Sequence, residues 1–301
     1  MAAPQLARVS ILGAGKMGAA AARRLAGLGY DVRVWNRTPA KAQRLAASTP
    51  AITVAASARE AVESADLCIA LLTTTDAVKA VVDDCRGLAF YKVLANLASG
   101  SPDDGRAVHA QVAEALPHAT CVDGAYCGPP PALEQGAGQL FVSCDRALDA
   151  QRRAALRCLG TTTFCPGVGS ARALDYAVVD MAFVTLMSYA ANAAMLESEG
   201  VDLKTTMDCV ARRLATAPGA LEAAAARMAD RSDGAYAADP TATLETWRNF
   251  WDSRRPYLRK TGASTELPDF CVGVLDRAGA RGPHGGGDVT RIQEVLRYKD
   301  G

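Results

Sequence analysis

Three glycines near the start of the chain are spaced as in a loop that holds a phosphate group. Gly13, Gly15 and Gly18 follow a β-branched run and open an alanine-rich one. In such a strand–loop–helix unit the first glycine allows a tight turn, the second lets backbone approach a pyrophosphate, and the third lets helix and strand pack closely. The helix N-terminus then offers free amides to the anion. The pattern predicts a dinucleotide-binding loop made by Gly13, Ala14, Gly15, Lys16, Met17 and Gly18.

The end of the next β-branched run indicates which dinucleotide binds. A dinucleotide without a 2′-phosphate is usually held there by an Asp or Glu on the ribose hydroxyls, whereas this chain has Asn36. Arg37, Thr38 and Lys41 follow, and all three can donate hydrogen bonds to a phosphate group. A solvated surface Arg and Lys would not explain the missing carboxylate. The segment therefore predicts a preference for NADPH.

A carboxylate, Asp175, stands near the start of a long apolar segment. A carboxyl group held beside a C=N bond can protonate the nitrogen or stabilise the iminium by charge pairing, and either effect assists hydride attack on the carbon. Burial of such a group would raise its pKa toward the working pH. The alternative, that Asp175 caps a helix or pairs with Arg172, stays open at this point.

Short β-branched runs alternate with Ala/Leu-rich stretches from Arg8 to about Pro166, which is the pattern of parallel strands joined by crossover helices. The sequence therefore predicts an α/β fold with a doubly wound Rossmann sheet. Because ligands bind at the carboxyl ends of such strands, Leu72, Thr73 and Thr74 are expected to touch the cofactor. The predicted strands are 8–12, 31–35, 67–72, 92–96, 120–123, 139–143 and 161–165.

The strand signals nearly vanish after Gly169. The segment from about 170 to 198 has the spacing of a helix buried on most sides. Two domains are predicted: a dinucleotide-binding domain over 1–168, and an all-helical dimerisation domain over 169–301 that begins with this long interdomain helix. The helical pattern is broken at Pro218-Gly219, Asp233-Gly234, Asp239-Pro240 and 281–287.

Composition excludes several classes of partner. Lys plus Arg number 33 and Asp plus Glu 32, with no run of five like charges, which disfavours nucleic acid and membrane surfaces. The longest charge-free apolar run, 181–196, is shorter than the roughly 20 residues needed to cross a bilayer. The first residues also lack the pattern of a signal peptide.

The cysteines and histidines disfavour a disulfide framework and a zinc site. Nine cysteines is an odd number, none of them forms a C-x-x-C pair, and the three histidines are scattered. Free thiols fit a reducing compartment. We therefore expect a cytoplasmic protein without a bound metal.

These motifs together resemble the β-hydroxyacid dehydrogenase superfamily and, within it, the imine reductases and reductive aminases. The resemblance covers nearly the whole chain, and the order and spacing of the motifs are specific. The motifs that carry it are 13–18, 34–38 with Lys41, 96–102, 123–130, 173–177 and 285–296.

The resemblance implies a homodimer whose subunits exchange their helical domains, so that the active site lies in a cleft with residues from both chains. It also places Asp175 where many imine reductases carry an aspartate. Similar hydroxyacid dehydrogenases carry a catalytic lysine there instead, and this chain has no lysine between Lys92 and Lys204. The resemblance thus implies reduction of a small imine with NADPH.

Helical spacing and the resemblance suggest further pocket residues. Val179 and Phe183 follow Asp175 at intervals of four and share its helix face. Phe183 stands at a position that resembles a tyrosine site of reductive aminases, and the missing hydroxyl favours reduction of a preformed cyclic imine over coupling of a ketone with an amine. Asn96, at a strand end, is expected near both the nicotinamide ribose and the substrate. Tyr126, Trp247 and Trp251 complete the predicted pocket.

The sequence therefore predicts an NADPH-dependent imine reductase in which Asp175 donates a proton or anchors the iminium. Two alternatives stay open. A carbonyl or 3-hydroxyacid dehydrogenase of the same fold would need another proton donor, such as Tyr126 or Tyr176. A non-catalytic NADPH-binding protein would bind the cofactor without turning over any imine or carbonyl compound.

Overall fold

The computed structural model describes residues 8–90, 92–215, 222–226, 228, 243–280 and 289–296. The chain forms two compact units, Met1–Met181 and Ala182–Gly301. The division falls inside the long helix, whereas the sequence analysis placed the domain boundary after Val168.

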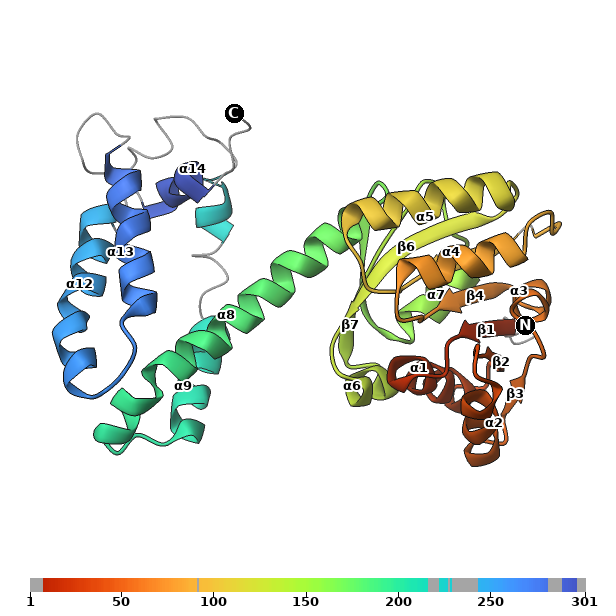
Figure 1. Ribbon diagram of the computed structural model, residues 1–301, viewed down its shortest axis with the longest axis horizontal. Coiled ribbons are helices and arrows are strands. Elements are labelled where there is room, and N and C mark those ends of the chain that lie inside the picture. Colours follow the sequence, from red (N-terminus) through yellow and green to blue (C-terminus); the bar gives the residue numbers. More distant parts are fainter. Residues whose placement is uncertain are drawn as a thin grey trace. The chain divides into compact units, whose positions relative to one another are not determined.

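Strands and helices alternate along the first unit (Figure 1). In chain order they are β1 (Arg8–Leu12), α1 (Lys16–Gly27), β2 (Asp31–Trp35), α2 (Pro39–Ser48), β3 (Ile52–Val54), α3 (Ala58–Ser64), β4 (Leu67–Ala70), α4 (Thr75–Asp84), β5 (Val93–Asn96), α5 (Pro102–Ala115), β6 (Thr120–Cys127), α6 (Pro130–Gln135), β7 (Gly138–Cys144), α7 (Ala150–Arg157), β8 (Gly160–Pro166) and the start of α8 (Ser170–Ser198).

The strands form one sheet in the order β3-β2-β1-β4-β5-β6-β7-β8. The order reverses between β1 and β4, as in a doubly wound sheet, and the predicted fold class is confirmed. One expectation is wrong: β6 and β7 are antiparallel, while the other neighbouring pairs are parallel. The chain from Cys127 to Gly138 holds only the short α6, and a parallel crossover needs about a dozen residues or more.

Two apolar clusters fill the two faces of the sheet. One contains buried residues of α1, α2, α6 and α7, and the other contains buried residues of α3, α4 and α5. Figure 1 shows α4 and α5 on one side of the sheet and α1, α2 and α6 on the other. The carboxyl ends of β1 and β4, which are neighbouring strands, therefore open on the same edge of a rigid sheet.

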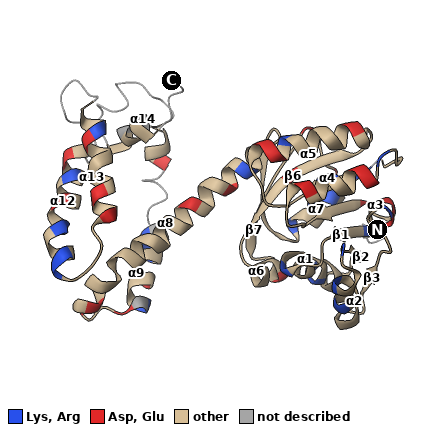
Figure 2. Ribbon diagram, viewed as in Figure 1, with Lys and Arg blue, Asp and Glu red and all other residues tan. Residues whose placement is uncertain are grey.

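The regular elements of the second unit are helices among the described residues, as predicted. They are the rest of α8, α9 (Leu203–Ala215), α12 (Leu244–Lys260), α13 (Glu266–Gly279), the short η1 (Val289–Arg291) and α14 (Ile292–Leu296). Figure 2 shows residues of both charge signs interspersed over the helices of each unit. The breaks predicted at Pro218-Gly219, Asp233-Gly234, Asp239-Pro240 and 281–287 lie outside the described residues.

α8 has the bounds that the sequence predicts, but its environment differs. Only Ala171 and Arg172 are buried, and Met181 and Phe183 are 73% and 60% exposed. The expectation of a helix buried on most sides is therefore wrong for this chain taken alone. With 29 residues and a mean hydropathy of 1.3 in its most apolar window, α8 meets the length and composition of a membrane span, which core helices of soluble proteins also meet.

Candidate active site

The loop between β1 and α1 has a geometry that requires its glycines. Gly13 has a φ of +110°, and a Cβ there would lie 2.5 Å from the carbonyl oxygen of Leu71. A Cβ on Gly18 would lie 1.9 Å from the carbonyl oxygen of Gly13. Gly15 caps α1 and has no heavy atom within 4 Å of its Cβ position, and the first turn of α1 carries no acid. Open space and uncapped amides fit a pyrophosphate at this place.

Asn36, at the end of β2, ties two loops together. Its Oδ1 accepts a hydrogen bond from the backbone N–H of Ala14 at 3.0 Å, and its Nδ2 donates to the carbonyl oxygen of Thr38 at 3.0 Å. A carboxylate could accept the first bond but could not donate the second. The amide thus fixes the glycine loop relative to the start of α2 and adds no negative charge.

Donors for a 2′-phosphate gather at the N-terminus of α2. Arg37, Thr38 and Lys41 are exposed, and Thr38 caps the helix without a side-chain hydrogen bond. In the described part of the chain, no hydrogen bond or ion pair occupies the side chains of Arg37 and Lys41. These free donors fit an added phosphate group.

The loop after β4 lies beside the glycine loop, as the neighbouring strands β1 and β4 require. The side chain of Leu72 approaches Gly13, where a Cβ would meet it at 3.3 Å. Thr74 caps α4, since its hydroxyl accepts a hydrogen bond from the N–H of Ala77 at 3.2 Å. Thr73 is exposed beside them. The three predicted residues thus lie together at the reversal point of the sheet, and cofactor contact stays a prediction.

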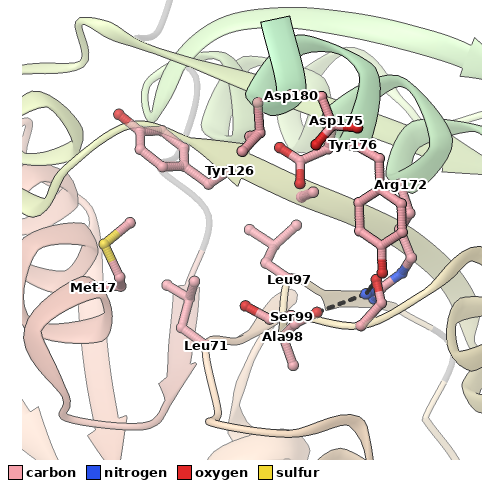
Figure 3. A pocket seen from close by; sticks show the side chains of 13 residues that line it. Met17, Leu71, Leu97, Ala98, Ser99, Tyr126, Arg172, Asp175, Tyr176 and Asp180 are labelled. Carbon is pink, nitrogen blue, oxygen red and sulfur yellow. Dashed lines mark hydrogen bonds between the residues drawn. The ribbon is translucent and has the colours of Figure 1, made fainter. Parts of the chain in front are cut away.

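A cavity of about 490 Å³ opens next to these loops in the first unit. Figure 3 shows its two sides, with residues of α8 facing Leu71 and the segment that follows β5. Its wall includes Met17, Leu71, Leu97, Ser99, Asp175 and Val179. The same cavity is therefore lined by Met17 of the glycine loop and by Asp175, the predicted acid.

Asp175 lies half-buried in this cavity wall, and its Oδ1 is buried without a hydrogen-bond partner among the described residues. Burial raises the pKa of its carboxyl group above the ordinary aspartate value, and the positive charge of Arg172 opposes that rise. α8 begins at Ser170, so Asp175 lies inside the helix and does not cap it. Arg172 forms its ion pair with Asp123 instead, at 2.7 Å. Neither structural alternative for Asp175 is therefore found.

Asn96 is fully buried at the end of β5 and does not belong to the described cavity wall. Its Oδ1 accepts a hydrogen bond from the N–H of Ala98 at 3.2 Å, and its Nδ2 donates to Asp123 at 3.5 Å. The amide is therefore engaged within the protein beneath the cavity wall, and contact of Asn96 with the cofactor or substrate stays a prediction. The residues after it, Leu97 to Gly100, reach the cavity instead.

Tyr126 and Val179 both line the cavity, as predicted pocket residues would. The Tyr126 hydroxyl points away from Asp175 in Figure 3 and lies over Gly138, where a Cβ would come within 2.1 Å of it. Tyr126 thus belongs to the cavity wall with its hydroxyl directed away from Asp175, and contact with a substrate stays a prediction. Val179 lies one helical turn after Asp175 and is partly exposed.

The remaining predicted pocket residues belong to the second unit. Phe183 is 60% exposed, and Trp247 and Trp251 each pack edge-to-face against Phe250 on α12. Arg254 lies over the Trp251 ring at 4.9 Å from its centroid. Contact of these aromatic residues with a substrate stays a prediction.

Sequence reasoning missed several wall residues. Leu71 and Leu97 directly follow β4 and β5, and position alone could have indicated them, because the carboxyl ends of strands form the site. Asp180 follows Asp175 by five residues and left no signal in the helical spacing. No group of three or more His, Cys, Asp or Glu residues that could hold a metal is found within the described ranges.

Residues 8–167 match the family described as the NAD binding domain of 6-phosphogluconate dehydrogenase, and residues 167–298 match the NADPH-dependent reductive aminase-like C-terminal domain. No curated protein matches the chain.

Solved structures match over nearly the full length. A reductive aminase from Aspergillus terreus in complex with NADPH and ethyl levulinate is 25% identical, with a TM-score of 0.80, and the match covers 97% of this chain and 100% of that one. An imine reductase from Myxococcus stipitatus in complex with NADP+ is 26% identical, with a TM-score of 0.77 and coverage of 96% and 100%. A Streptomyces aurantiacus imine reductase, 24% identical with a TM-score of 0.83 and coverage of 97% and 100%, shares the fold.

Proposed function

We infer that this chain, which belongs to the family with the NAD binding domain of 6-phosphogluconate dehydrogenase and carries a reductive aminase-like C-terminal domain, is an NADPH-dependent imine reductase. The observation that carries the inference is the single cavity lined by Met17 of the glycine loop and by Asp175. A cofactor cradle and an acid with a raised pKa thus share one space.

The residues of the first unit fit NADPH. The backbone amides after Gly15 would hold the pyrophosphate, and Arg37, Thr38 and Lys41 would hold the 2′-phosphate. The chemistry that NADPH supplies when bound is a hydride for the imine carbon. NADPH would therefore bind to backbone amides and side chains that no other described part of the protein engages.

Asp175 is assigned the proton or the compensating charge at the imine nitrogen. A neutral carboxyl group, favoured by burial, donates a proton to the nitrogen, while an ionised one stabilises an iminium that arrives protonated. The apolar side chains of Leu71, Leu97 and Val179 would exclude water around that nitrogen and strengthen both effects.

The substrate we propose is a preformed cyclic imine. The similar solved structures include a reductive aminase. Phe183, however, stands at a position that resembles a tyrosine site of reductive aminases, and it lacks the tyrosine hydroxyl. Carbonyl reduction is the rival activity, with Tyr176 as its proton donor, because both tyrosines line the cavity but the Tyr126 hydroxyl points away from Asp175.

We further propose a homodimer in the cytoplasm. The middle of α8 exposes large apolar side chains, Met181, Phe183, Leu186 and Met187, without a charge between Asp180 and Glu197. An exposed apolar surface of this kind is typical of an interface, and exchange of helical domains between subunits would cover it. All nine cysteines are free, which fits a reducing compartment.

The test measures the loss of nicotinamide absorbance with NADPH or NADH and a panel of cyclic imines, an aldehyde and a 3-hydroxy acid. We expect NADPH oxidation with cyclic imines only. Asp175→Ala should lower that turnover by roughly 10²- to 10⁴-fold, as for loss of a general acid, and leave NADPH affinity nearly unchanged. Asp84→Ala, an exposed acid on α4, is the control.

Activity with the aldehyde or hydroxy acid alone would move the protein to the carbonyl branch. Tight NADPH binding without any turnover would indicate a non-catalytic role. Unchanged imine turnover in Asp175→Ala would contradict the role of that residue.

A further inference from the structure

One guanidinium group joins the first turn of α8 to the end of the sheet. Arg172 is 1% exposed and Asp123 is 0% exposed, and Nε of Arg172 donates to Oδ1 of Asp123 at 2.7 Å. Nη1 of Arg172 donates to the carbonyl oxygens of Ala98 and Gly100 at 2.7 and 3.3 Å. Figure 3 shows the bond to Ala98. Three segments, α8, β6 and the loop after β5, therefore meet at one side chain.

α5 closes over this ion pair. A Cβ on Gly105 would lie 2.5 Å from Oδ2 of Asp123 and 2.7 Å from Nε of Arg172, so a larger residue would displace the pair. Asn96 contacts the pair from β5, because its Nδ2 donates to Asp123. The pair is thus enclosed by the protein on several sides.

The ion pair of Arg172 and Asp123 is not expected to add much to the stability of the fold by itself. Among the described residues, Nη2 of Arg172 and Oδ2 of Asp123 are buried without hydrogen-bond partners. Burial raises the pKa of Asp123, and Arg172 opposes that rise. Apolar residues of similar volume often stabilise a fold as well as a buried ion pair does. The position of the pair, between the first turn of α8 and the loop after β5, therefore points to a role in holding the cavity walls in place.

Arg172 stands one helical turn before Asp175 and on the same side of α8. The loop that it holds, Leu97 to Gly100, forms one wall of the cavity, and Asp175 belongs to another. The hydrogen bonds of Arg172 therefore connect the two walls and constrain the distance between them. The positive charge of Arg172 also acts on the Asp175 carboxyl group.

We propose that Arg172 is a positioning residue for Asp175, which it fixes against the cavity wall through Asp123, Ala98 and Gly100 while holding a positive charge beside the acid. The inference rests on the proposed function only in taking Asp175 as the acid that acts on the substrate. It assigns to Arg172 no contact with substrate or cofactor.

Other groups facing Asp175 are few. The Cys127 thiol of β6 is kept neutral because burial and the Asp175 charge raise its pKa. Tyr126 on β6 and Tyr176 and Asp180 on α8 also line the cavity. Removal of the Arg172 charge should therefore raise the pKa of Asp175, since Arg172 is the nearby cation that lowers it.

The experiment compares three variants. Arg172→Met with Asp123→Asn removes both charges without leaving a buried carboxylate unpaired. Arg172→Lys keeps the charge, but a single ammonium cannot reproduce the planar, forked set of donors. Arg86→Met with Asp83→Asn removes the exposed ion pair at the C-terminal end of α4, together with the exposed pair of Arg86 and Glu114, and is the control. The readouts are the pKa of Asp175 from carboxyl ¹³C NMR, the pH profile of kcat/KM, kcat and KM for the imine, and the Kd for NADPH.

In the neutral double variant we expect the pKa of Asp175 to rise, because the nearby cation is lost, with kcat lowered roughly tenfold to a hundredfold by misplacement. The Kd for NADPH should stay unchanged. Arg172→Lys should keep the pKa near that of the wild type and recover part of kcat. The control should change neither quantity.

An unchanged pKa of Asp175 together with an unchanged kcat in the double variant would overturn the proposal. If that variant does not fold, Arg172→Lys decides by itself, because full wild-type kcat there also overturns it. A wild type without imine turnover would refute the proposed function, yet the NMR titration would still measure whether Arg172 controls Asp175.

Discussion

The two units of the chain bury their apolar residues to very different extents. The first unit packs two clusters against the two faces of its sheet, with many fully buried side chains. In the described part of the second unit, one cluster contains only Leu244, Leu275 and Ala278 as buried residues. The first unit therefore carries its own core, while the second leaves apolar surface for another molecule to cover. The proposed cofactor-binding residues and Asp175 belong to the first unit.

The largest expected effect concerns the two cores. Leu94→Ala in β5 removes a fully buried side chain and should cost about 2–5 kcal/mol of unfolding free energy, independent of protein concentration. Leu275→Ala in α13 should cost less, and the loss should depend on concentration, because the proposed dimerisation would complete that unit. Denaturant unfolding at several protein concentrations measures both. Equal losses of unfolding free energy that do not depend on protein concentration would contradict the difference between the two units.

The next effect concerns the exposed part of α8. Phe183→Glu should prevent dimerisation, because it places a charge on a surface that would otherwise be buried, and an apolar side chain of this size contributes about 1.5–3 kcal/mol when buried. Sedimentation equilibrium measures the result. Leu28→Glu, on an exposed leucine of the first unit, is the control and should leave the mass unchanged. A dimeric Phe183→Glu variant would place the interface elsewhere.

NADPH affinity tests whether the first unit binds the cofactor by itself. Arg37→Ala should raise the Kd for NADPH by about ten- to a hundredfold, as expected for a lost hydrogen bond to a charged group, with little change for NADH. Arg44→Ala, an exposed arginine further along α2, is the control. Phe183→Glu should bind NADPH as the wild type does. Equal losses for both cofactors in Arg37→Ala would argue against the phosphate role.

The smallest effect is a shift of the pH profile. Because the pKa of Asp175 is raised, the profile of kcat/KM should show an ionisation above the ordinary aspartate range that disappears in Asp175→Asn. Activity that falls as pH rises through this pKa identifies a proton donor, and activity that falls as pH drops through it identifies an iminium anchor. Asp180→Asn distinguishes the neighbouring carboxylate. A profile without such an ionisation would contradict both roles.

The sequence predicted the strands that local pattern marks clearly and missed those that it does not. β3 has three residues with Ile52 alone buried, too short for alternation to be visible. The prediction ended its fifth strand at Asp123, although the corresponding strand β6 continues to Cys127, and this hid the short turn that makes β7 antiparallel. Local pattern thus predicted the type of each element, whereas the direction in which β6 and β7 pair depended on where β6 ends.

The site shows the same limit. The glycine loop and Asn36 are close in sequence to the strands that place them, so their position followed from pattern. Arg172 and Asp123 are 49 residues apart, and the sequence offered Asp175 as the nearer partner of Arg172. Only the folded sheet brings β6 under the start of α8. Long-range pairing of charges therefore lay beyond what spacing along one helix could predict.

The two hydrogen bonds of Asn36 bear on any redesign of cofactor preference. An aspartate there could still accept from Ala14, but it would lose the donation to Thr38 that links the β2 end to α2. A switch toward NADH made by Asn36→Asp alone would loosen the turn between β2 and α2, which carries the proposed 2′-phosphate donors. Redesign has more freedom at Arg37 and Lys41, whose side chains no described group of the protein uses, with the amide of Asn36 kept in place.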